Sequence, residues 1–265
     1  AGAIEFKGTV TVPTGSKYHV VDSTAPKVVN LSANRNLIIN GDMRIDQRNL
    51  GTWTNVFADT YTQDRWLFVS TQGSKYTVQQ STDTPVGFSN SMLITSLSDY
   101  SVGTGDTFLI EQRIEGFNTA QLESGTVNAK TVTLSLYVKS SLTGTFGGAI
   151  VNSATNRSYP FSYTISSANT WERKSITFTC DTTGTWIGST NGIGMVLRLG
   201  LGSGSTYTGT AGAWVAGNLV QSTGSQSIVG TSGATFYITG VQLEVGEEAT
   251  PFEHRPYDME LERCK

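Results

Sequence analysis

Two pairs of acidic residues lie close enough in the sequence to suggest chemistry on a sugar. A glycosidase needs two carboxyl groups about 5–10 Å apart, and the nearest candidates are Asp59 with Asp64 and Glu111 with Glu115. Glu111 and Glu115 are four residues apart, so they would share one face of a β-strand. The interpretation that we favour is two solvated edge charges offset by Arg113. We therefore predict no catalytic residue.

The motifs of nucleotide-dependent and metal-dependent enzymes are missing. The glycine-rich run GLGSG at residues 200–204 does not satisfy GxGxxG, and no strand–loop–helix unit surrounds it. HExxH, GxSxG and EF-hand spacings are absent. Cys180 and Cys264 lack the CxxC spacing of a zinc site, and Cys180 sits in an alternating pattern that predicts a small core residue. No cofactor and no metal site are expected.

Tryptophans offer a different chemistry, because an indole ring can stack on the apolar face of a sugar. Trp53 and Trp186 lie among Gly, Thr and Asn residues that predict loops, and Trp214 is the chief apolar residue of the Gly/Ser/Thr-rich stretch 200–233. These three are the glycan-binding candidates, although a loop tryptophan can equally plug the edge of a core. Trp66 and Trp171 are interpreted as core residues.

The elements that carry these residues are predicted to be strands. Runs rich in Thr, Val, Ile, Tyr and Phe alternate with Gly/Ser/Asn/Asp clusters, which indicates a sandwich or barrel of about a dozen strands. The predicted strands are 7–12, 37–39, 66–69, 76–79, 92–96, 108–114, 127–140, 161–165, 172–179, 194–199 and 235–245. In residues 131–139, Val132, Leu134 and Leu136 would face a core while the intervening Thr and Ser residues face water.

The two ends of the chain differ in pattern from the strand-rich middle. Residues 1–35 are predicted to form an extended arm whose alternating Ile4, Phe6, Val10 and Val12 would pair with another chain. Thr250 to Glu253 has a capping-box pattern, and a short helix is expected from Asp258. Length and charge narrow the function: with 265 residues, 15% charged residues and a net charge of −3, the chain is not expected to bind nucleic acid or to insert into a membrane.

Several short strings in the sequence resemble those of a known group of proteins. The sequence NLIINGDMRIDQR at 36–48, followed by DRW at 64–66, resembles the opening of a domain of tailed-bacteriophage tail-fibre and virion proteins. FYITGVQLEVG at 236–246, ATPFEHR at 249–255 and DMELERC at 258–264 are similar to the ends of such chains. The strand order also resembles jelly-roll carbohydrate-binding modules, whose first strand would be residues 37–42. Gly240 stands where many of those modules carry an acidic calcium ligand, so no calcium is expected.

The resemblance implies an all-β jelly-roll β-sandwich at 36–250, with the extended N-terminal arm at 1–35 and a C-terminal helical tail at 251–265. The implied protein is a non-enzymatic structural component on the exterior of the virion. The resemblance itself does not say whether the domain binds sugar. Weighing it with the loop tryptophans, we expect a tail fibre or receptor-binding domain that assembles with itself as a trimer and with other virion proteins, and that attaches to host surface polysaccharide. A capsid-decorating protein is the alternative. A polysaccharide depolymerase is a third hypothesis. Tailspike depolymerases usually carry long β-helix repeats, and this sequence shows no such repeat.

Overall fold

The computed structural model describes the backbone of residues 18–22, 25–29, 34–48 and 60–265, and the side chains of 34–48 and 60–265. Trp53 and the arm residues Ile4, Phe6, Val10 and Val12 lie outside the described residues. Within the described part of the chain, every helix is far shorter than the roughly 20 residues that cross a bilayer.

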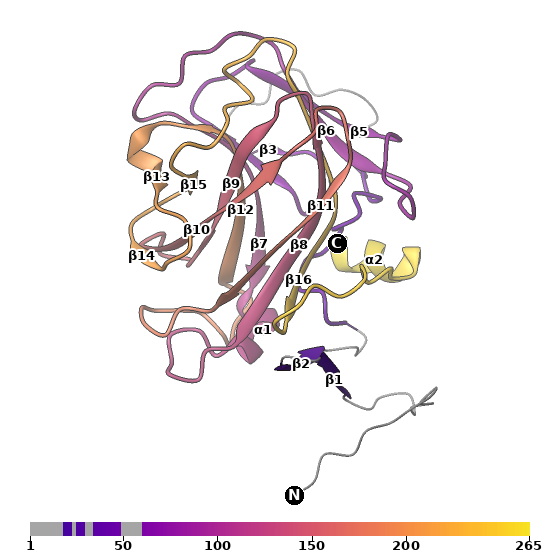
Figure 1. The fold of residues 1–265 in the computed structure, drawn as a ribbon, viewed down its shortest axis with the longest axis vertical. Coiled ribbons are helices and arrows are strands. Elements are labelled where there is room, and N and C mark those ends of the chain that lie inside the picture. The colour runs from indigo at the N-terminus through magenta and orange to yellow at the C-terminus, as the bar shows by residue number, and fades with distance from the viewer. Residues whose placement is uncertain (1–17, 23–24, 30–33, 49–59) are drawn as a thin grey trace, which may run out of the picture.

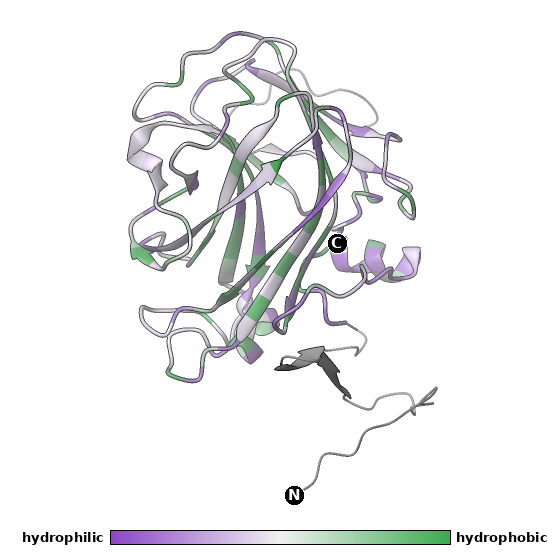
Figure 2. Ribbon diagram, in the orientation of Figure 1, coloured by the Kyte–Doolittle hydropathy of each residue, from purple (hydrophilic) through white to green (hydrophobic). Residues whose placement is uncertain are grey.

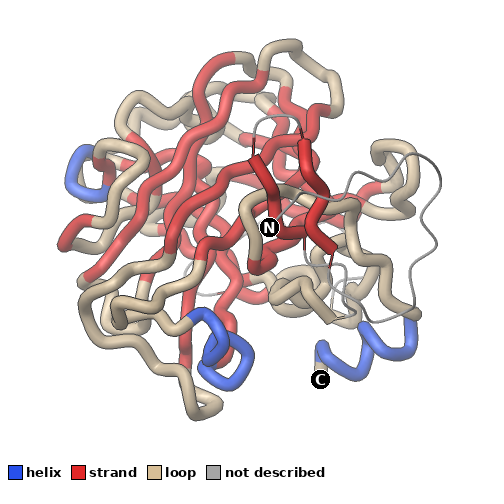
Figure 3. Tube along the Cα trace, turned by 60° about the horizontal axis from the view of Figure 1, so that its bottom comes forward, coloured by secondary structure: helices blue, strands red, loops and turns tan. Residues whose placement is uncertain are grey.

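Most of the strands form two antiparallel sheets that pack face to face (Figures 1 and 3). The seven-stranded sheet has the spatial order β14 (Val215–Ala216), β10 (Arg157–Ile165), β9 (Gly144–Val151), β12 (Ile193–Ser203), β7 (Thr107–Glu115), β4 (Leu67–Ser70) and β3 (Thr60–Tyr61). The five-stranded sheet has the order β11 (Glu172–Thr179), β8 (Thr131–Ser140), β16 (Thr235–Val245), β6 (Ser91–Ser96) and β5 (Tyr76–Ser81). The chain passes repeatedly between the sheets, so the predicted all-β jelly-roll sandwich is confirmed.

The remaining elements are small. They are the hairpin β1 (Tyr18–Asp22) and β2 (Ala25–Val29), the parallel pair β13 (Thr208–Gly209) and β15 (Gln221–Ser222), the short helices α1 (Gly116–Thr119), η1 (Ala120–Leu122) and η2 (Ser205–Tyr207), and the C-terminal helix α2 (Tyr257–Cys264). Figure 3 shows α2 at the periphery of the stacked strands.

Period-two alternation explains the core. Val132, Leu134 and Leu136 on β8 are fully buried between the sheets, and Figure 2 shows hydrophobic bands separated by more hydrophilic ones along this strand. The opposite face of β8 differs from the prediction, because Thr133 and Ser135 are buried as well. The chain that follows β16 lies over them: the Thr133 hydroxyl donates to the Gly246 carbonyl at 2.9 Å.

The opening string, predicted to begin with a strand at 37–39, is not a strand. It is an irregular segment held by single hydrogen bonds to β16, such as the 2.9 Å bond from the Leu37 N–H to the Leu243 carbonyl. Gly41 lies so close to β16 that a Cβ atom there would sit 2.1 Å from the Val241 carbonyl oxygen. The first strand implied by the resemblance is therefore wrong, although its residues do pack against the last strand.

The closing string completes this contact. Glu253 accepts hydrogen bonds from the backbone N–H groups of Asn34 and Asn36, and Arg255 donates to the carbonyls of Asn36 and Ile38. We call segments 34–45 and 250–264 together the terminal clasp. The predicted capping box is wrong, because Glu253 satisfies amides of the opening segment and residues 250–255 are not helical.

Helix α2 confirms the predicted C-terminal helix. Its Glu260 carboxylate is buried, pairing with Arg255 at 3.2 Å and accepting the Asn40 N–H. Cys264 packs with Ile39 and Ile45 in a small apolar cluster. The helix therefore belongs to the terminal clasp.

Residues 200–233 are more ordered than the predicted irregular excursion. Strand β12 continues to Ser203, and residues 205–222 cover the outer faces of β9 and β12, where β15 contacts both strands. Strand β9 went unpredicted because it is rich in glycine. At Gly148 a Cβ atom would sit 2.2 Å from the Arg198 carbonyl oxygen, so this strand needs glycine in order to pack.

Candidate functional site

A groove follows the outer face of β7. Phe108, Ile110 and Ile114 point into the core, so the alternate residues face outward. The outward set lines two adjoining hollows, and Arg113 belongs to both of them. The outward residues are Thr107, Leu109, Glu111, Arg113 and Glu115. At a rise of about 3.4 Å per residue they span roughly 27 Å, and we call this feature the β7 groove.

The middle of the β7 groove is built around Glu111, whose side chain is 4% exposed. It accepts hydrogen bonds from Arg113 at 2.8 Å and from Arg198 of the neighbouring strand β12 at 3.1 Å. Arg198 also donates to Asn218 Oδ1 at 2.6 Å and to the Leu219 carbonyl at 3.1 Å. A single carboxylate thus orients two guanidinium groups and ties β12 to the covering segment. Tyr207 of η2 lines the wall beside them.

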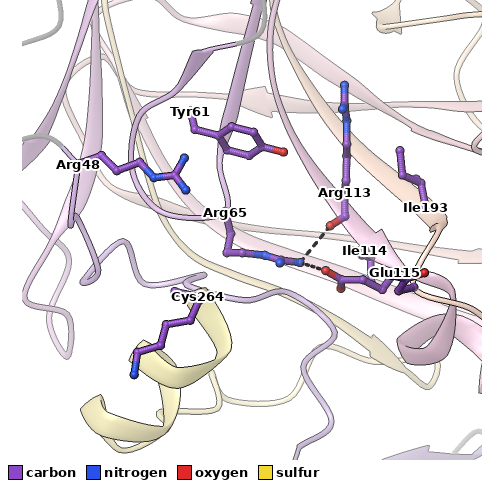
Figure 4. A pocket seen from close by; sticks show the side chains of 10 residues that line it. Arg48, Tyr61, Arg65, Arg113, Ile114, Glu115, Ile193 and Cys264 are labelled. Carbon is purple, nitrogen blue, oxygen red and sulfur yellow. Dashed lines mark hydrogen bonds and ion pairs between the residues drawn. The ribbon is translucent and has the colours of Figure 1, made fainter.

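The other end of the groove is a hollow of about 410 Å³ that contains four cationic side chains. Figure 4 shows Arg48 and Tyr61 on one side, Arg113 and Glu115 on the other, and Arg65 reaching between them. The Arg48 guanidinium lies over the Tyr61 ring, 5.4 Å from its centroid. We call this the cationic end. Its volume falls within the 300–1,000 Å³ range of small-ligand sites.

Glu115 is the only carboxylate among the residues described as lining the cationic end. It pairs with Arg65 and accepts a 3.1 Å hydrogen bond from Asn118. Partial burial favours protonation of Glu115, but the hydrogen bonds and charge of Arg65, together with Asn118, outweigh it, so the pKa of this carboxyl is lowered. The carboxylate stays charged at neutral pH and fixes the Arg65 guanidinium in place.

This arrangement suits recognition more than acid–base catalysis. Glu111 and Glu115 do share a face of β7, as predicted, and their Cα atoms are about 13 Å apart along the strand. Arg113 stands between them, and each carboxylate is bound to guanidinium groups. The prediction of two solvated edge charges is wrong for Glu111, which is buried in an interior strand of the sheet.

The predicted tryptophans lie elsewhere. The structure brings Trp186 and Trp214 together, in an edge-to-face contact with centroids 5.3 Å apart. Trp214 also packs against Tyr159 and Phe178, so both half-buried indoles close the edge between β10 and β11. Their N–H groups donate to backbone carbonyls at 3.0 and 2.8 Å. Neither lines the β7 groove.

Three other residues interpreted from the sequence, Trp66, Trp171 and Cys180, belong to the sandwich itself. Trp66 is fully buried, as predicted. Trp171 is only half buried, on the outer face of the five-stranded sheet, where its N–H donates to Asp83 at 3.0 Å. Cys180 is a core residue, and burial raises the pKa of its thiol to about 11. Among the described residues, no three His, Cys, Asp or Glu side chains gather as a metal site would require.

Sequence reasoning missed Tyr61, Arg198 and Tyr207. The usable signal was the charged alternation at 111, 113 and 115, which places three ionisable side chains on one face of a strand. Arg198 could not be linked to it, because it lies 87 residues later in the chain.

Comparisons with known proteins bear on the fold alone. The sequence matches no established protein family and no curated protein. Among solved structures, the enzymatically active domain of tailspike protein 4 from bacteriophage CBA120 aligns over 80% of this chain, with 14% identity and a TM-score of 0.42. This chain spans only 21% of that tailspike chain.

Carbohydrate-binding modules also align. A xylan-binding domain of carbohydrate-binding module family 22 matches 76% of this chain and 99% of its own, at 13% identity and a TM-score of 0.38. The module TmCBM61, solved with β-1,4-galactotriose, matches 80% of this chain and 99% of its own, at 9% identity and a TM-score of 0.37. These likenesses concern the arrangement of strands in a sandwich.

Proposed function

We propose that this chain is a non-enzymatic virion protein of a tailed bacteriophage that attaches to host surface glycan through the β7 groove. The observation that carries the glycan part is the combination of fixed guanidinium donors at Glu111 with tyrosines on both flanks of the groove. Sugar hydroxyls are recognised by oriented polar groups, and the C–H faces of sugar rings pack on aromatic rings.

The groove is pre-organised for such a ligand. Arg198 is tied both to Glu111 and to the covering segment, so its guanidinium loses little freedom when a ligand binds. Tyr61, 38% exposed, lines the cationic end, and half-buried Tyr207 lines the hollow beside Glu111. The hollow beside Glu111 has a volume of about 160 Å³ and the cationic end about 410 Å³, so together they accommodate a short saccharide.

The non-enzymatic part of the proposal is supported by the partners of the groove carboxylates. A glycosidase acid has a raised pKa and lies about 5–9.5 Å from its partner carboxyl group. Glu115 has a lowered pKa and Glu111 is bound by two arginines. A polysaccharide depolymerase would need a different pair of acids.

The virion part rests on the opening and closing strings and on the Thr/Ser-rich surface strands. In the tail-fibre proposal, several copies on one particle multiply a modest affinity per site. Residues 1–35 would then join neighbouring subunits, most simply as a trimer. Immunogold electron microscopy of the particle that carries this chain tests the location. Label on the tail supports a fibre, whereas label over the head supports the capsid-decorating alternative.

The glycan site is tested by binding of the purified chain to a glycan array and to host cells. Tyr207→Ala and Tyr61→Ala remove the two flanking rings, and the expected result is about a fivefold loss of affinity for each, from stacking worth about 1 kcal/mol. Tyr257→Ala, which removes an exposed tyrosine of α2, is the matched control and should bind normally.

Trp186→Ala and Trp214→Ala separate the groove from the tryptophan cluster. Loss of binding in these variants with intact thermal stability would move the site to the edge between β10 and β11. Trp53→Ala belongs in the same series, as the third predicted glycan-binding tryptophan. Unchanged binding in both tyrosine variants would reject the β7 groove.

A further inference from the structure

The charge of the cationic end departs from that of the whole chain. The chain carries 18 basic and 21 acidic residues, for a net charge of −3. The residues that line the cationic end include Arg48, Arg65, Arg113 and Lys265, with Glu115 as the acidic side chain among them. Arg113 is also paired with Glu111, and Lys265 with Glu262. The cationic end therefore gathers several cationic groups in one concave place on an acidic protein, where low-dielectric walls strengthen their field.

Arg65 has an unfavourable backbone for its residue type. Its φ angle is 73°, in the left-handed region that suits glycine or asparagine. It lies in a turn closed by the 3.0 Å hydrogen bond from the Trp66 N–H to the Gln63 carbonyl. Glycine would adopt this backbone conformation with less strain than arginine does. The arginine is therefore explained by the contacts of its side chain. That side chain enters the cationic end beside Glu115 (Figure 4).

Arg48 and Arg65 are held in different ways, and both leave donors for a ligand. A guanidinium group has five N–H donors. Arg65 uses one nitrogen, Nη2, on Glu115 and on the Arg113 carbonyl at 3.4 Å. Arg48 lies over the Tyr61 ring, and this cation–π contact uses none of its N–H donors. Planar guanidinium groups at the wall of a cavity match the geometry of a carboxylate.

We infer that the cationic end of the β7 groove binds the carboxylate of an acidic saccharide, such as a uronic acid unit, while the Glu111–Arg198 part of the groove holds its neutral neighbours. This inference rests on the proposed glycan-binding function and specifies its ligand class. The carboxylate accepts hydrogen bonds from Arg48 and Arg65, and the sugar ring packs beside Tyr61.

A saccharide fits these observations better than a nucleic acid. Nucleic-acid affinity comes from many phosphate contacts along a basic surface, and this chain is acidic overall, with four of its 18 basic side chains in this one hollow. The groove beyond Arg113 is walled by Val69, Tyr207 and Val220 and is less charged. A ligand that alternates acidic and neutral units has the same pattern.

The test is isothermal titration with four acidic polysaccharides that also contain neutral units: hyaluronate, unsulfated chondroitin, heparosan and gellan. Each is paired with its carboxyl-reduced or methyl-esterified form, which keeps the sugar and removes the charge. At least one acidic member should bind about tenfold or more tightly than its neutral partner, the loss expected when a charge-assisted hydrogen bond is removed. Raising the salt from roughly 0.1 M to roughly 1 M should weaken the acidic complex, because the Debye length falls from about 10 Å to about 3 Å.

Arg48→Gln is the decisive variant, because Arg48 is exposed and its loss leaves the core intact. It should weaken the acidic ligand about tenfold and leave the neutral partner unaffected. Arg173→Gln is the matched control, because Arg173 is also exposed and lies over a tyrosine, 5.9 Å from the Tyr137 ring centroid, on the other sheet. It removes the same charge and should bind as the wild type does.

Each remaining outcome contradicts the inference in a recognisable way. Equal binding of the acidic and neutral partners leaves the glycan-binding proposal standing and overturns the acidic specificity. Acidic binding that Arg48→Gln and Arg173→Gln weaken equally reflects overall charge and rejects the cationic end. Tight binding of a single-stranded DNA oligonucleotide, with none of any polysaccharide, overturns both proposals.

Discussion

Glu111 shows how one residue both stabilises the fold and shapes the β7 groove. Its buried carboxylate lies between Arg113 and Arg198, and loss of one partner from a buried ionic group typically lowers stability by about 3–5 kcal/mol. Glu111→Ala should reduce the free energy of unfolding by about that amount, measured by urea denaturation. The reason is that Arg198, 11% exposed, would lose the charge that compensates it.

Glu262→Gln provides the comparison, because its pair with Lys265 is largely exposed. An exposed pair contributes about 0–1 kcal/mol, so this variant should unfold almost as the wild type does. If the two variants lose similar stability, Glu111 is not the centre of a compensated network.

Gly41 is a residue whose missing side chain matters. A Cβ atom there would overlap the Val241 carbonyl oxygen of β16, so Gly41→Ala must push the opening segment away from the last strand. We expect a loss of about 2–3 kcal/mol in the free energy of unfolding. Gly105→Ala is the control, because no atom lies within 4 Å of its added Cβ. Normal stability of Gly41→Ala would show that the two segments can separate freely.

At the scale of elements, an ion pair joins the two sheets near the tryptophan cluster. Arg157 at the start of β10 donates to both carboxylate oxygens of Asp181, just after β11, at 2.6 and 2.9 Å. Burial opposes ionisation of Asp181, but the hydrogen bonds from Arg157 and Thr183 outweigh it and lower its pKa below 3.8. A lowered pKa stabilises the fold at pH values above 3.8, and this contribution is lost as the pH falls through the folded-state pKa.

Asp181→Asn should therefore be less stable than the wild type at neutral pH, by about 3 kcal/mol. The difference should shrink as the pH falls below about 4, because the wild-type carboxyl is then protonated too. Denaturation curves collected across this range measure the effect. Glu123→Gln, in the exposed pair with Lys130, should show little difference at any pH. A gap for Asp181→Asn that stays constant into strong acid would contradict the assigned pKa direction.

The long strands could be predicted because their signal is local. β11 and β16 occupy the predicted ranges 172–179 and 235–245, where β-branched and aromatic residues alternate with polar ones. Residues 37–39 carry the same apolar signal, yet what determines their structure is a contact with Arg255 and Leu243 more than 200 residues away. β9 carries the opposite signal, because its glycines are required by close packing that only the fold reveals.

The site was harder to predict than the fold for a similar reason. The even spacing of Glu111 and Glu115 placed them on one face, but their burial depends on Arg198 and on residues 205–222, which fold back over the sheet. The tryptophans attracted attention by their residue type. Trp186 and Trp214 owe their half-buried positions to aromatic neighbours, among them Tyr159, that come from distant strands.

At the scale of the whole molecule, the terminal clasp places the two resembling strings in contact. The Asn36 carbonyl accepts a hydrogen bond from Arg255, and the Asn36 N–H donates to Glu253, so the opening and closing strings act as one structural unit. Because each string holds the other in place, we interpret their joint presence in the sequence as a requirement for a stable fold. The groove that we propose for ligand binding lies mostly outside both strings, in the middle of the chain.

Removing residues from the two ends should therefore have opposite effects. Deletion of 250–265 removes Arg255 and Glu260, which hold the segment carrying Ile38, Met43 and Ile45. These three side chains are fully buried, and each contributes about 1.5–3 kcal/mol when buried. The free energy of unfolding should fall by at least about 4 kcal/mol, measured by urea denaturation.

Deletion of 1–33 should leave that energy unchanged, because the terminal clasp begins at Asn34. It should instead abolish self-association, measured by light scattering coupled to gel filtration. Among the described strands, β1 and β2 pair only with each other, and an isolated hairpin is marginally stable in water, so a neighbouring subunit is the partner that we propose for this region. A deletion variant that still assembles like the full chain would place the contacts between subunits on the sandwich.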